Sequence, residues 1–330
     1  MKLSIGKLRG LQQLADDNGF LTICAIDHRG ALQRAMNEKD PDAGTYQDMV
    51  DFKLDLCRVV APFVSAVLLD PVYGAAQAIA ASILPGHIGL LVSLEKTGYS
   101  GDKTARLTEL LPDWSVDKVK RMGASAVKLL VYFRPDLKEV ASRQLDLVAD
   151  VADLCIKEDI PLLVEPVSYP VEELGVSSQK FADIKPELVI ETARRITSLP
   201  IDVLKAEFPA DMKFEKDEKR LLQLCQELDR ASRLPWVLLS AGADFETFSR
   251  QVEIACKAGA SGFLAGRALW QEGVQISSRE ERLDFFRSTA APRLKKLAEM
   301  VRRYGRPWYA KVGSKAGEFE MASGNWYQQY

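Results

Sequence analysis

Three observations predict that this chain folds as a single-domain (β/α)8 (TIM) barrel of the α/β class. Eight short apolar runs are spread along residues 21–268, and each has the length of a strand buried on both faces, as in a parallel sheet. Segments with helical periodicity separate the runs, and eight such alternations are the number that closes this barrel. No linker, internal repeat or low-complexity tract divides the 330 residues. One barrel is therefore expected.

The strands are predicted from the apolar runs themselves. The first run reads LTICAI and the fourth reads AVKLLVY, so single polar residues interrupt otherwise apolar segments. In chain order, the strands are expected at 21–26, 65–69, 88–94, 126–132, 161–167, 203–208, 236–240 and 262–268.

The helices are predicted from apolar stripes and from start and stop signals. In 244–258, for example, Phe248, Val252 and Cys256 fall on one stripe, and Gly259 is a stop signal. The connection 71–87 has room for only a short helix and is the weakest βα unit. The expected helices are 45–61, 114–123, 139–158, 186–197, 216–231, 244–258 and 280–304.

A doubly wound open sheet is the alternative architecture for this alternation. Such a sheet normally carries a glycine-rich phosphate-binding turn after its first strand. Here the first strand is followed by Asp27, His28, Arg29 and Gly30, which do not form that pattern. The barrel is therefore favoured.

The last residues differ in composition from the rest of the chain. The segment 305–330 is rich in glycine and aromatic residues and has no helical period. Five Trp and Tyr residues are too many for a freely solvated tail: Trp308, Tyr309, Trp326, Tyr327 and Tyr330. We expect a barrel domain at 1–304 and a C-terminal tail at 305–330 that docks on the barrel or on a neighbouring subunit.

Composition and charge exclude several classes of function. The 44 Lys and Arg residues nearly balance the 46 Asp and Glu residues, so the net charge of -2 predicts neither a nucleic-acid nor a membrane partner. No apolar stretch approaches the roughly 18 residues of a membrane span. Five cysteines without a CxxC pair indicate a reducing compartment, and we expect a cytoplasmic protein. With only His28 and His87 as histidines, no histidine-rich metal site is expected, so the chemistry must rest on Lys, Asp, Glu or Tyr residues or on a bound cofactor.

Candidate functional residues lie where the predicted strands end, because the active site of a (β/α)8 barrel is at the C-terminal ends of its strands. Almost every run carries an ionisable or hydroxyl group there. In a small volume of low dielectric constant these charges would perturb one another's pKa values. The residues are Asp27, Asp70, Glu95, Lys128, Glu165, Lys205 with Glu207, Ser240, and Gly266 with Arg267.

Two lysines predict a particular chemistry. Lys205 and Lys128 each interrupt an apolar strand, where an unpaired amine would cost several kcal/mol. A second cation lowers the pKa of a neighbouring amine and leaves it partly neutral and nucleophilic, as imine formation with a carbonyl substrate requires. Glu207 is two residues from Lys205 and is expected on the same face of its strand. The alternative is that Lys205 only forms a structural ion pair with Glu165 or Glu207.

A phosphorylated substrate is predicted from the last two strands. Barrels frequently bind phosphate with the backbone N–H groups after strands seven and eight. Ser240, Ala241 and Gly242 follow the seventh run, and Gly266 and Arg267 lie in the eighth. Arg267 can hold a phosphate through two parallel hydrogen bonds. A second anionic group is expected near Arg29, Lys96 or Arg134.

The chain resembles the class I tagatose 1,6-bisphosphate aldolases. The motifs that carry this resemblance occur in order on, or directly after, seven of the eight predicted strands: AIDHRGAL at 25–32, LLDPVYG at 68–74, EKTGY at 95–99, AVKLL at 126–130, DVLKAEFP at 202–209, LSAG at 239–242 and GRA at 266–268. The related sulfofructose 1-phosphate aldolases share SAVLLD at 65–70 and ASGFLAGRALW at 260–270.

The resemblance implies a (β/α)8 enzyme, without a metal or other cofactor, that cleaves a ketohexose 1,6-bisphosphate to dihydroxyacetone phosphate and glyceraldehyde 3-phosphate. It further implies that Lys205 forms the imine and Glu165 transfers protons, with assistance from Asp27 and Lys128. The Ser-Ala-Gly and Gly-Arg motifs are implied to hold the 1-phosphate, and His28 and Arg29 are further candidates for substrate contact. A homo-oligomer, either a dimer or a tetramer, is also implied.

Two departures from the tagatose enzymes leave the substrate open. Those enzymes carry glutamine where this chain has His28, and the Glu165–Pro166 pair is similar to the sulfofructose enzymes. One alternative is therefore a sulfofructose 1-phosphate aldolase that gives dihydroxyacetone phosphate and sulfolactaldehyde. Another is a sugar-phosphate sensor without turnover.

Overall fold

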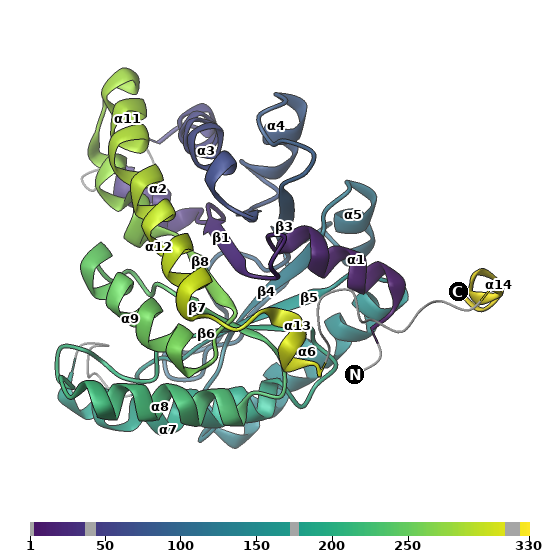
Figure 1. Cartoon of the computed structure of the whole chain (residues 1–330), viewed down its shortest axis with the longest axis vertical. Coiled ribbons are helices and arrows are strands. Elements are labelled where there is room, and N and C mark those ends of the chain that lie inside the picture. Colours follow the sequence, from purple (N-terminus) through teal and green to yellow (C-terminus); the bar gives the residue numbers. More distant parts are fainter. Residues whose placement is uncertain (1–2, 37–43, 172–177, 314–323) are drawn as a thin grey trace.

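Eight parallel strands close into a barrel in chain order (Figure 1). The computed structural model describes residues 3–36, 44–171, 178–313 and 324–330. All eight strands lie within the predicted runs, so the predicted (β/α)8 fold is confirmed. They are β1 (Leu21–Ala25), β2 (Ala66–Leu69), β3 (Gly89–Ser93), β4 (Ala126–Tyr132), β5 (Leu162–Val167), β6 (Val203–Ala206), β7 (Trp236–Leu239) and β8 (Gly262–Ala265).

The helices lie around the strands except for the last, which stands apart from the barrel (Figure 1). They are α1 (Ile5–Leu14), α2 (Gly30–Met36), α3 (Tyr46–Val60), α4 (Ala75–Ala80), α5 (Val116–Arg121), α6 (Lys138–Lys157), α7 (Gln179–Ile196), α8 (Glu218–Ala231), α9 (Phe245–Ala258), α10 (Arg267–Trp270), α11 (Arg279–Phe285), α12 (Ala291–Tyr304), α13 (Trp308–Lys311) and α14 (Trp326–Gln329). Short 3-10 turns lie at Ala61–Phe63 and Gln271–Gln275. As expected, the 71–87 connection holds only the six-residue α4.

Alternation along the strands divides the apolar residues into two cores. On β1, Leu21, Ile23 and Ala25 belong to the cluster that fills the barrel, whereas Cys24 belongs to the cluster between strands and helices. Successive strand residues point to opposite faces, so a strand buried on both faces is apolar throughout. This explains why the strands read as continuous apolar runs.

The end of the barrel at which the strands begin, here called the lower end, is closed by segments from both ends of the chain. Leu11 and Leu14 of α1 and Trp308 of α13 belong to the inner cluster, and Trp308 is only 2% exposed. The backbone N–H of Trp308 donates to Gly19 O at 3.0 Å, which ties α13 to the turn before β1. At the opposite end, where the strands finish, charged side chains face the barrel interior.

Some helical boundaries differ from the prediction. The helix expected at 186–197 begins seven residues earlier, at Gln179, where Ser178 Oγ accepts from Phe181 N; Pro186 therefore lies inside α7. The helix expected at 280–304 is present as α11 and α12 joined through a π-helical segment at Phe286–Ala290. Pro292 has no N–H to donate to the preceding turn, and a widened turn before it accommodates that loss.

Helices α1 and α2 were not predicted. The cap of α1 comes from far along the chain: Asp159 Oδ2 accepts from Gly6 N at 2.7 Å, and Asp159 Oδ1 accepts from Lys7 N at 3.2 Å. Such a partner is invisible in the local sequence. Helix α2 buries only Leu32, so it lacks an apolar stripe that would predict it.

The described part of the tail contacts the barrel. Lys311 Nζ donates to Asp229 O at 2.6 Å, and Tyr309 OH donates to Asn18 O at 3.2 Å. Tyr330 OH accepts from Gly6 N at 3.1 Å. Residues 314–323 of the predicted tail lie outside the described residues, and the division into 1–304 and 305–330 stays a prediction.

Candidate active site

A buried lysine gathers three carboxylates at the C-terminal ends of the strands. Lys128 Nζ on β4 lies 2.8 Å from Asp27 Oδ2, 2.6 Å from Glu95 Oε1 and 3.0 Å from Glu165 Oε2. The Lys128 side chain is 2% exposed. The other oxygen of Glu95 accepts from Leu130 N at 3.1 Å, which fixes that carboxylate. Residues from four regions of the chain thus meet around one ammonium group.

Glu165 joins this group to a second lysine. Its Oε1 lies 2.7 Å from Lys205 Nζ on β6, while its Oε2 contacts Lys128. The Lys205 side chain is 5% exposed. One carboxylate is therefore shared between two lysines, and it is placed to exchange a proton with Lys205.

Mutual attraction keeps these groups charged despite their burial. Burial would raise the pKa of Asp27, but Lys128, Lys205 and His28 hold that pKa well below its usual range. Burial would likewise raise the pKa of Glu165, yet the two lysines lower it. Burial would lower the pKa of Lys128, but its carboxylate partners raise it well above the ordinary value. Lys128 is thus a fixed cation.

His28 lies beside this cluster as a neutral ring. Its Nδ1 is 3.7 Å from Asp27 Oδ1, and its ring packs edge-on against Trp270 with centroids 5.1 Å apart. Burial is the largest cause that lowers its pKa, to about 4; Asp27 opposes this, whereas Arg267, Lys205 and Lys53 add to it. His28 Nδ1 is buried and has no hydrogen-bond partner among the described residues.

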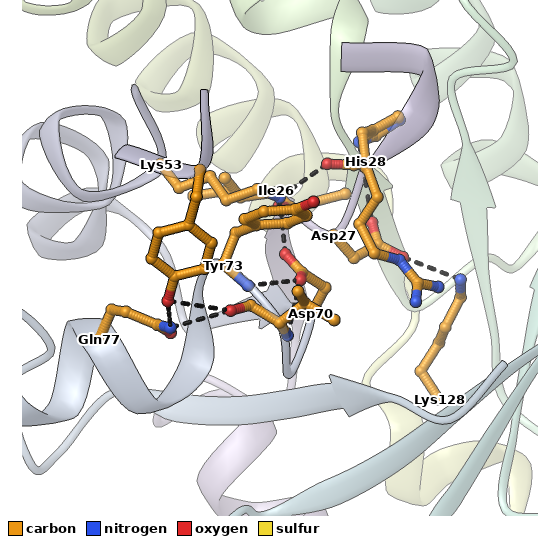
Figure 2. Close-up of polar contacts among 12 residues, drawn as sticks. Ile26, Asp27, His28, Lys53, Asp70, Tyr73, Gln77 and Lys128 are labelled. Carbon is orange, nitrogen blue, oxygen red and sulfur yellow. Dashed lines mark hydrogen bonds and ion pairs between the residues drawn. The ribbon is translucent and has the colours of Figure 1, made fainter. Parts of the chain in front are cut away.

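The loop that carries Asp27 and His28 is held by a buried ion pair (Figure 2). Lys53 Nζ on α3 donates to Ile26 O at 2.6 Å and to His28 O at 2.7 Å. It also lies 2.7 Å from Asp70 Oδ2, and neither side chain of this ion pair is exposed. The two backbone contacts of Lys53 fix the main chain on both sides of Asp27.

Asp70 extends that support to the loop after β2. Its Oδ1 accepts from Val72 N at 2.9 Å and from Tyr73 N at 2.8 Å. Gln77 Nε2 donates to Val72 O at 2.9 Å (Figure 2). Asp70 was expected among the charged residues at the strand ends. It supports the loop after β2 and has no ion pair with Lys128 or Lys205 among the described residues.

The residues expected to bind phosphate lie together after β7 and β8. Ala241 and Gly242 have φ values of 48° and 78°, a left-handed turn in which Gly242 avoids the strain of a side chain. A Cβ on Gly242 would lie 3.1 Å from Arg267 Cζ, so the guanidinium group rests against this turn. Ser240 is buried beneath it, and a Cβ on Gly266 would lie 2.6 Å from His28 Cε1. The structure thus places Gly266 against His28, and Arg267 against the turn at Ala241 and Gly242.

Other expected residues have different partners. Arg29 Nη2 donates to Glu95 O at 2.5 Å. Lys96 pairs with Glu109 on the surface at 3.2 Å, and buried Arg134 pairs with Asp136 at 2.6 Å. Glu207 Oε2 accepts from Ser168 N at 2.8 Å, whereas the ion pair of Lys205 is with Glu165.

Sequence reasoning did not assign roles to Glu95 or Lys53. Glu95 was recognised as a polar residue at a strand end, but its ion pair with Lys128 depends on the register between β3 and β4, where Ser93 pairs with Lys128. Lys53 lies on the buried stripe of α3 with Met49, Phe52 and Leu56. A lysine on an apolar helical stripe indicates a buried charge that needs a partner. The sequence alone does not show that this partner is Asp70.

The cysteines lie where their thiols stay protonated. All five cysteines are free and buried, and burial raises the pKa of every thiol. In residues 3–36, 44–171, 178–313 and 324–330, no cluster of three or more His, Cys, Asp and Glu side chains is placed to hold a metal ion. Within the same ranges, no helix has the length and apolar character to cross a membrane.

Comparison with known proteins decides the family. The model of the DeoC/LacD family of aldolases matches residues 21–272, which include all eight strands. The chain belongs to the DeoC/LacD aldolase family. The family resemblance and the prediction of an aldolase are therefore confirmed.

Curated relatives of this DeoC/LacD aldolase cover most of its length. It is 37% identical to tagatose 1,6-diphosphate aldolase 1 of Enterococcus faecalis, over 83% of this chain and 86% of that protein. It is 32% identical to tagatose 1,6-diphosphate aldolase of Lactococcus lactis, over 94% of this chain and 100% of that protein.

Solved structures similar to this DeoC/LacD aldolase share its fold at low sequence identity. An archaeal fructose 1,6-bisphosphate aldolase has a TM-score of 0.56 and 22% identity, with 88% of this chain and 97% of that chain covered. Fructose-bisphosphate aldolase from Plasmodium falciparum has a TM-score of 0.66 and 14% identity, with 93% and 98% covered. These similarities agree with the closed barrel.

Proposed function

We propose that this chain is a Schiff-base aldolase that reversibly cleaves tagatose 1,6-bisphosphate, or an epimer of it, to dihydroxyacetone phosphate and glyceraldehyde 3-phosphate. The observation that carries the proposal is the carboxylate of Glu165, shared between Lys205 and the fixed cation Lys128. The names of the Enterococcus and Lactococcus relatives support the choice of substrate.

In the proposed mechanism, Lys205 is the nucleophile. It gives an ammonium proton to Glu165, and its lone pair then attacks C2 of the open-chain ketose. Glu165 returns the proton to the C2 hydroxyl of the carbinolamine, which leaves as water, and a protonated imine remains. This cation is the electron sink for the next step.

Glu165 then acts as the base for cleavage. It takes the proton of the C4 hydroxyl, the electrons of the C3–C4 bond move into the imine, and C4 leaves as the aldehyde carbon of glyceraldehyde 3-phosphate. The same proton is delivered to C3 of the enamine. Water hydrolyses the regenerated imine, which releases dihydroxyacetone phosphate and restores the Lys205 ammonium group.

The neighbouring groups orient the substrate. Lys128 and Asp27 set the local potential and bind hydroxyl groups, and Arg29 and neutral His28 contribute further polar contacts. Ser240, Ala241, Gly242, Gly266 and Arg267 hold the 1-phosphate. This role is supported by the left-handed turn at Ala241 and Gly242 and by the guanidinium group beside it.

The physiological setting follows from the same resemblance. We propose a homo-oligomer, a dimer or a tetramer, that works in the cytoplasm without a cofactor. Five free, buried cysteines support a reducing compartment.

The decisive experiment is borohydride trapping with dihydroxyacetone phosphate, followed by intact-mass and peptide mass spectrometry. We expect a covalent adduct on Lys205 and none in Lys205→Ala, a variant that should lose cleavage but still bind phosphate. An adduct on Lys128 would exchange the roles of the two lysines. Phosphate binding without any adduct would contradict the proposal and favour a sensor.

A second candidate substrate is sulfofructose 1-phosphate, which Glu165–Pro166 favours because this pair is similar to the sulfofructose enzymes. The same lysine would form the imine, and the products would be dihydroxyacetone phosphate and sulfolactaldehyde. Competition between the two ketoses in one assay distinguishes the candidates, since the better substrate has the higher kcat/KM.

A further inference from the structure

An arginine stands among aromatic rings near the end of β4. Arg106 lies in the β3–α5 connection, which folds back on itself through antiparallel bridges of Ser100 with Leu107 and Glu95 with Leu110. The Arg106 guanidinium carbon is 4.6 Å from the ring centroid of Tyr99, 4.8 Å from that of Tyr169 and 5.8 Å from that of Tyr132 (three contacts at cation–π distance).

This guanidinium group has no carboxylate partner in the described part of the chain. Its Nε donates to Lys103 O at 3.0 Å, and the Arg106 backbone N–H donates to Tyr169 OH at 3.2 Å. The other cations expected to bind a second anion differ in this respect, because Lys96 pairs with Glu109 and Arg134 pairs with Asp136. Arg106 is thus a positioned cation without a carboxylate partner among the residues that the structure describes.

Strand alternation connects Arg106 to the charged cluster. Tyr132 is four residues beyond Lys128 on β4, so both side chains leave the same face of the strand. Lys128 contacts Asp27, which follows β1, and Glu165 of β5, so this face is the barrel interior. Tyr132 therefore stands above Lys128 on the interior face, and Arg106 lies against the Tyr132 ring.

The order of the strands sets the direction of the substrate. The proposed 1-phosphate site lies after β7 and β8, and in a closed barrel of eight strands in chain order the opposite side is β3 and β4. A ketose with C1 at β7 and β8 and C2 at Lys205 extends its far end across the barrel. That end reaches the side where Arg106 stands.

We propose that Arg106 binds the anionic group on C6 of the substrate and so determines specificity for a doubly anionic ketose. The inference rests on the proposed function. Phosphate and sulfonate both present oxygens that a guanidinium group binds through parallel hydrogen bonds. Packing against three tyrosine rings restricts the arginine side chain before binding, which reduces the entropy cost of the contact.

The test compares substrates with and without the C6 anion. kcat/KM is measured for a ketohexose 1,6-bisphosphate and for the matching ketohexose 1-phosphate, with the wild-type enzyme, Arg106→Met and Arg106→Lys. In Arg106→Met we expect the preference for the bisphosphate to fall about 10- to 100-fold, with little change for the 1-phosphate. Arg106→Lys should restore part of the preference because it keeps the charge.

Lys96→Met is the matched control, since Lys96 is a cation of the same connection that already has a partner. Its substrate preference should stay within about twofold of wild type. An equal loss of preference in Lys96→Met and Arg106→Met would indicate a general effect of charge and would overturn the assignment. So would an unchanged preference in Arg106→Met.

Two further measurements separate the possible outcomes. Borohydride trapping of dihydroxyacetone phosphate on Lys205 should be unchanged in Arg106→Met, because this product has no C6; a wild-type enzyme that gives no adduct would contradict the proposed function instead. A ketose 1-phosphate with a C6 sulfonate identifies the anion. If only this substrate shows the Arg106-dependent preference, Arg106 is a sulfonate-binding residue.

Discussion

Lys53 illustrates how a residue outside the charged cluster positions it. Its ammonium group binds the backbone on both sides of Asp27 and pairs with Asp70, with no exposure to water. A buried ion pair adds little net stability compared with apolar residues of the same size, but removing one partner leaves the other charge buried alone. The pair therefore serves to fix the loop.

Lys53→Met should lower the free energy of unfolding by about 3–5 kcal/mol, because the Asp70 carboxylate then loses its buried counter-ion. Chemical denaturation measures the loss. Lys96→Met, which breaks an exposed pair with Glu109, is the control and should cost less than about 1 kcal/mol. Equal losses in the two variants would refute the role given to Lys53.

His28 should make stability depend on pH. Its pKa is about 4 in the folded protein and about 6.5 when unfolded. Between these values the unfolded state binds a proton that the folded state does not, so the free energy of unfolding falls as the pH is lowered from about 6.5 to 4. Above about 6.5 this contribution is fully present.

His28→Gln removes this titration and keeps a polar side chain. Denaturation of both proteins at pH 7 and pH 4.5 tests the effect, and wild type should lose more stability than the variant over that interval. The carboxylates titrate in both proteins and cancel in the comparison. A stability difference that is the same at both pH values would contradict a depressed pKa of His28.

At this scale, sequence reasoning found residues whose position follows from strand periodicity. Asp27, Lys128, Glu165 and Lys205 lie at strand ends or on inward faces, and the structure brings them together. Arg106 lies in an irregular connection instead. Its place among three rings is set by chain reversal between β3 and α5, for which no periodicity exists.

Closure of the barrel depends on one glycine at the start of β8. Gly262 pairs with Leu21 of β1 and with Val237 of β7, and its φ of 148° is one that side chains rarely adopt. A Cβ there would lie 1.9 Å from Leu21 O, a backbone atom. Only glycine allows the first and last strands to approach this closely.

Gly262→Ala should therefore lose at least about 2 kcal/mol more stability than Gly123→Ala. Gly123 has a similarly positive φ of 87° but open space around it, so its substitution carries backbone strain without a steric clash. Thermal and chemical denaturation compare the two variants. If both lose the same stability, strain rather than close approach is the cost at position 262.

The strands were predicted well because the pattern of apolar residues alone determines where they lie. They read as apolar runs because both of their faces are largely buried, and the exceptions are functional candidates such as Lys128 on β4 and Lys205 on β6. Helix α1 was missed because Asp159 caps it across the fold, and α7 was predicted too short because it continues through Pro186. A long-range contact decided the first case, whereas in the second a local cap at Ser178 starts the helix before the proline.

On the scale of the molecule, Trp308 closes the barrel below its apolar interior. Trp308→Ala should lower the free energy of unfolding by about 3–5 kcal/mol, because a large buried ring is replaced by a cavity. Trp326→Ala is the matched control, since Trp326 is 40% exposed and should cost less than about 1 kcal/mol. Comparable losses would show that Trp308 does not hold the lower end together.

One end of this barrel contributes stability, and the other holds the candidate active site. Leu11, Leu14 and Trp308 close the lower end with apolar contacts, whereas the charged side chains gather at the other. Burial of charges for function limits how much stability the upper end can provide. The lower end can therefore offset a loss, so that substitutions which adapt the mouth to new substrates are tolerated while the base stays intact. This spatial separation makes the fold evolvable: selection can change specificity at one end without meeting the residues that maintain stability at the other.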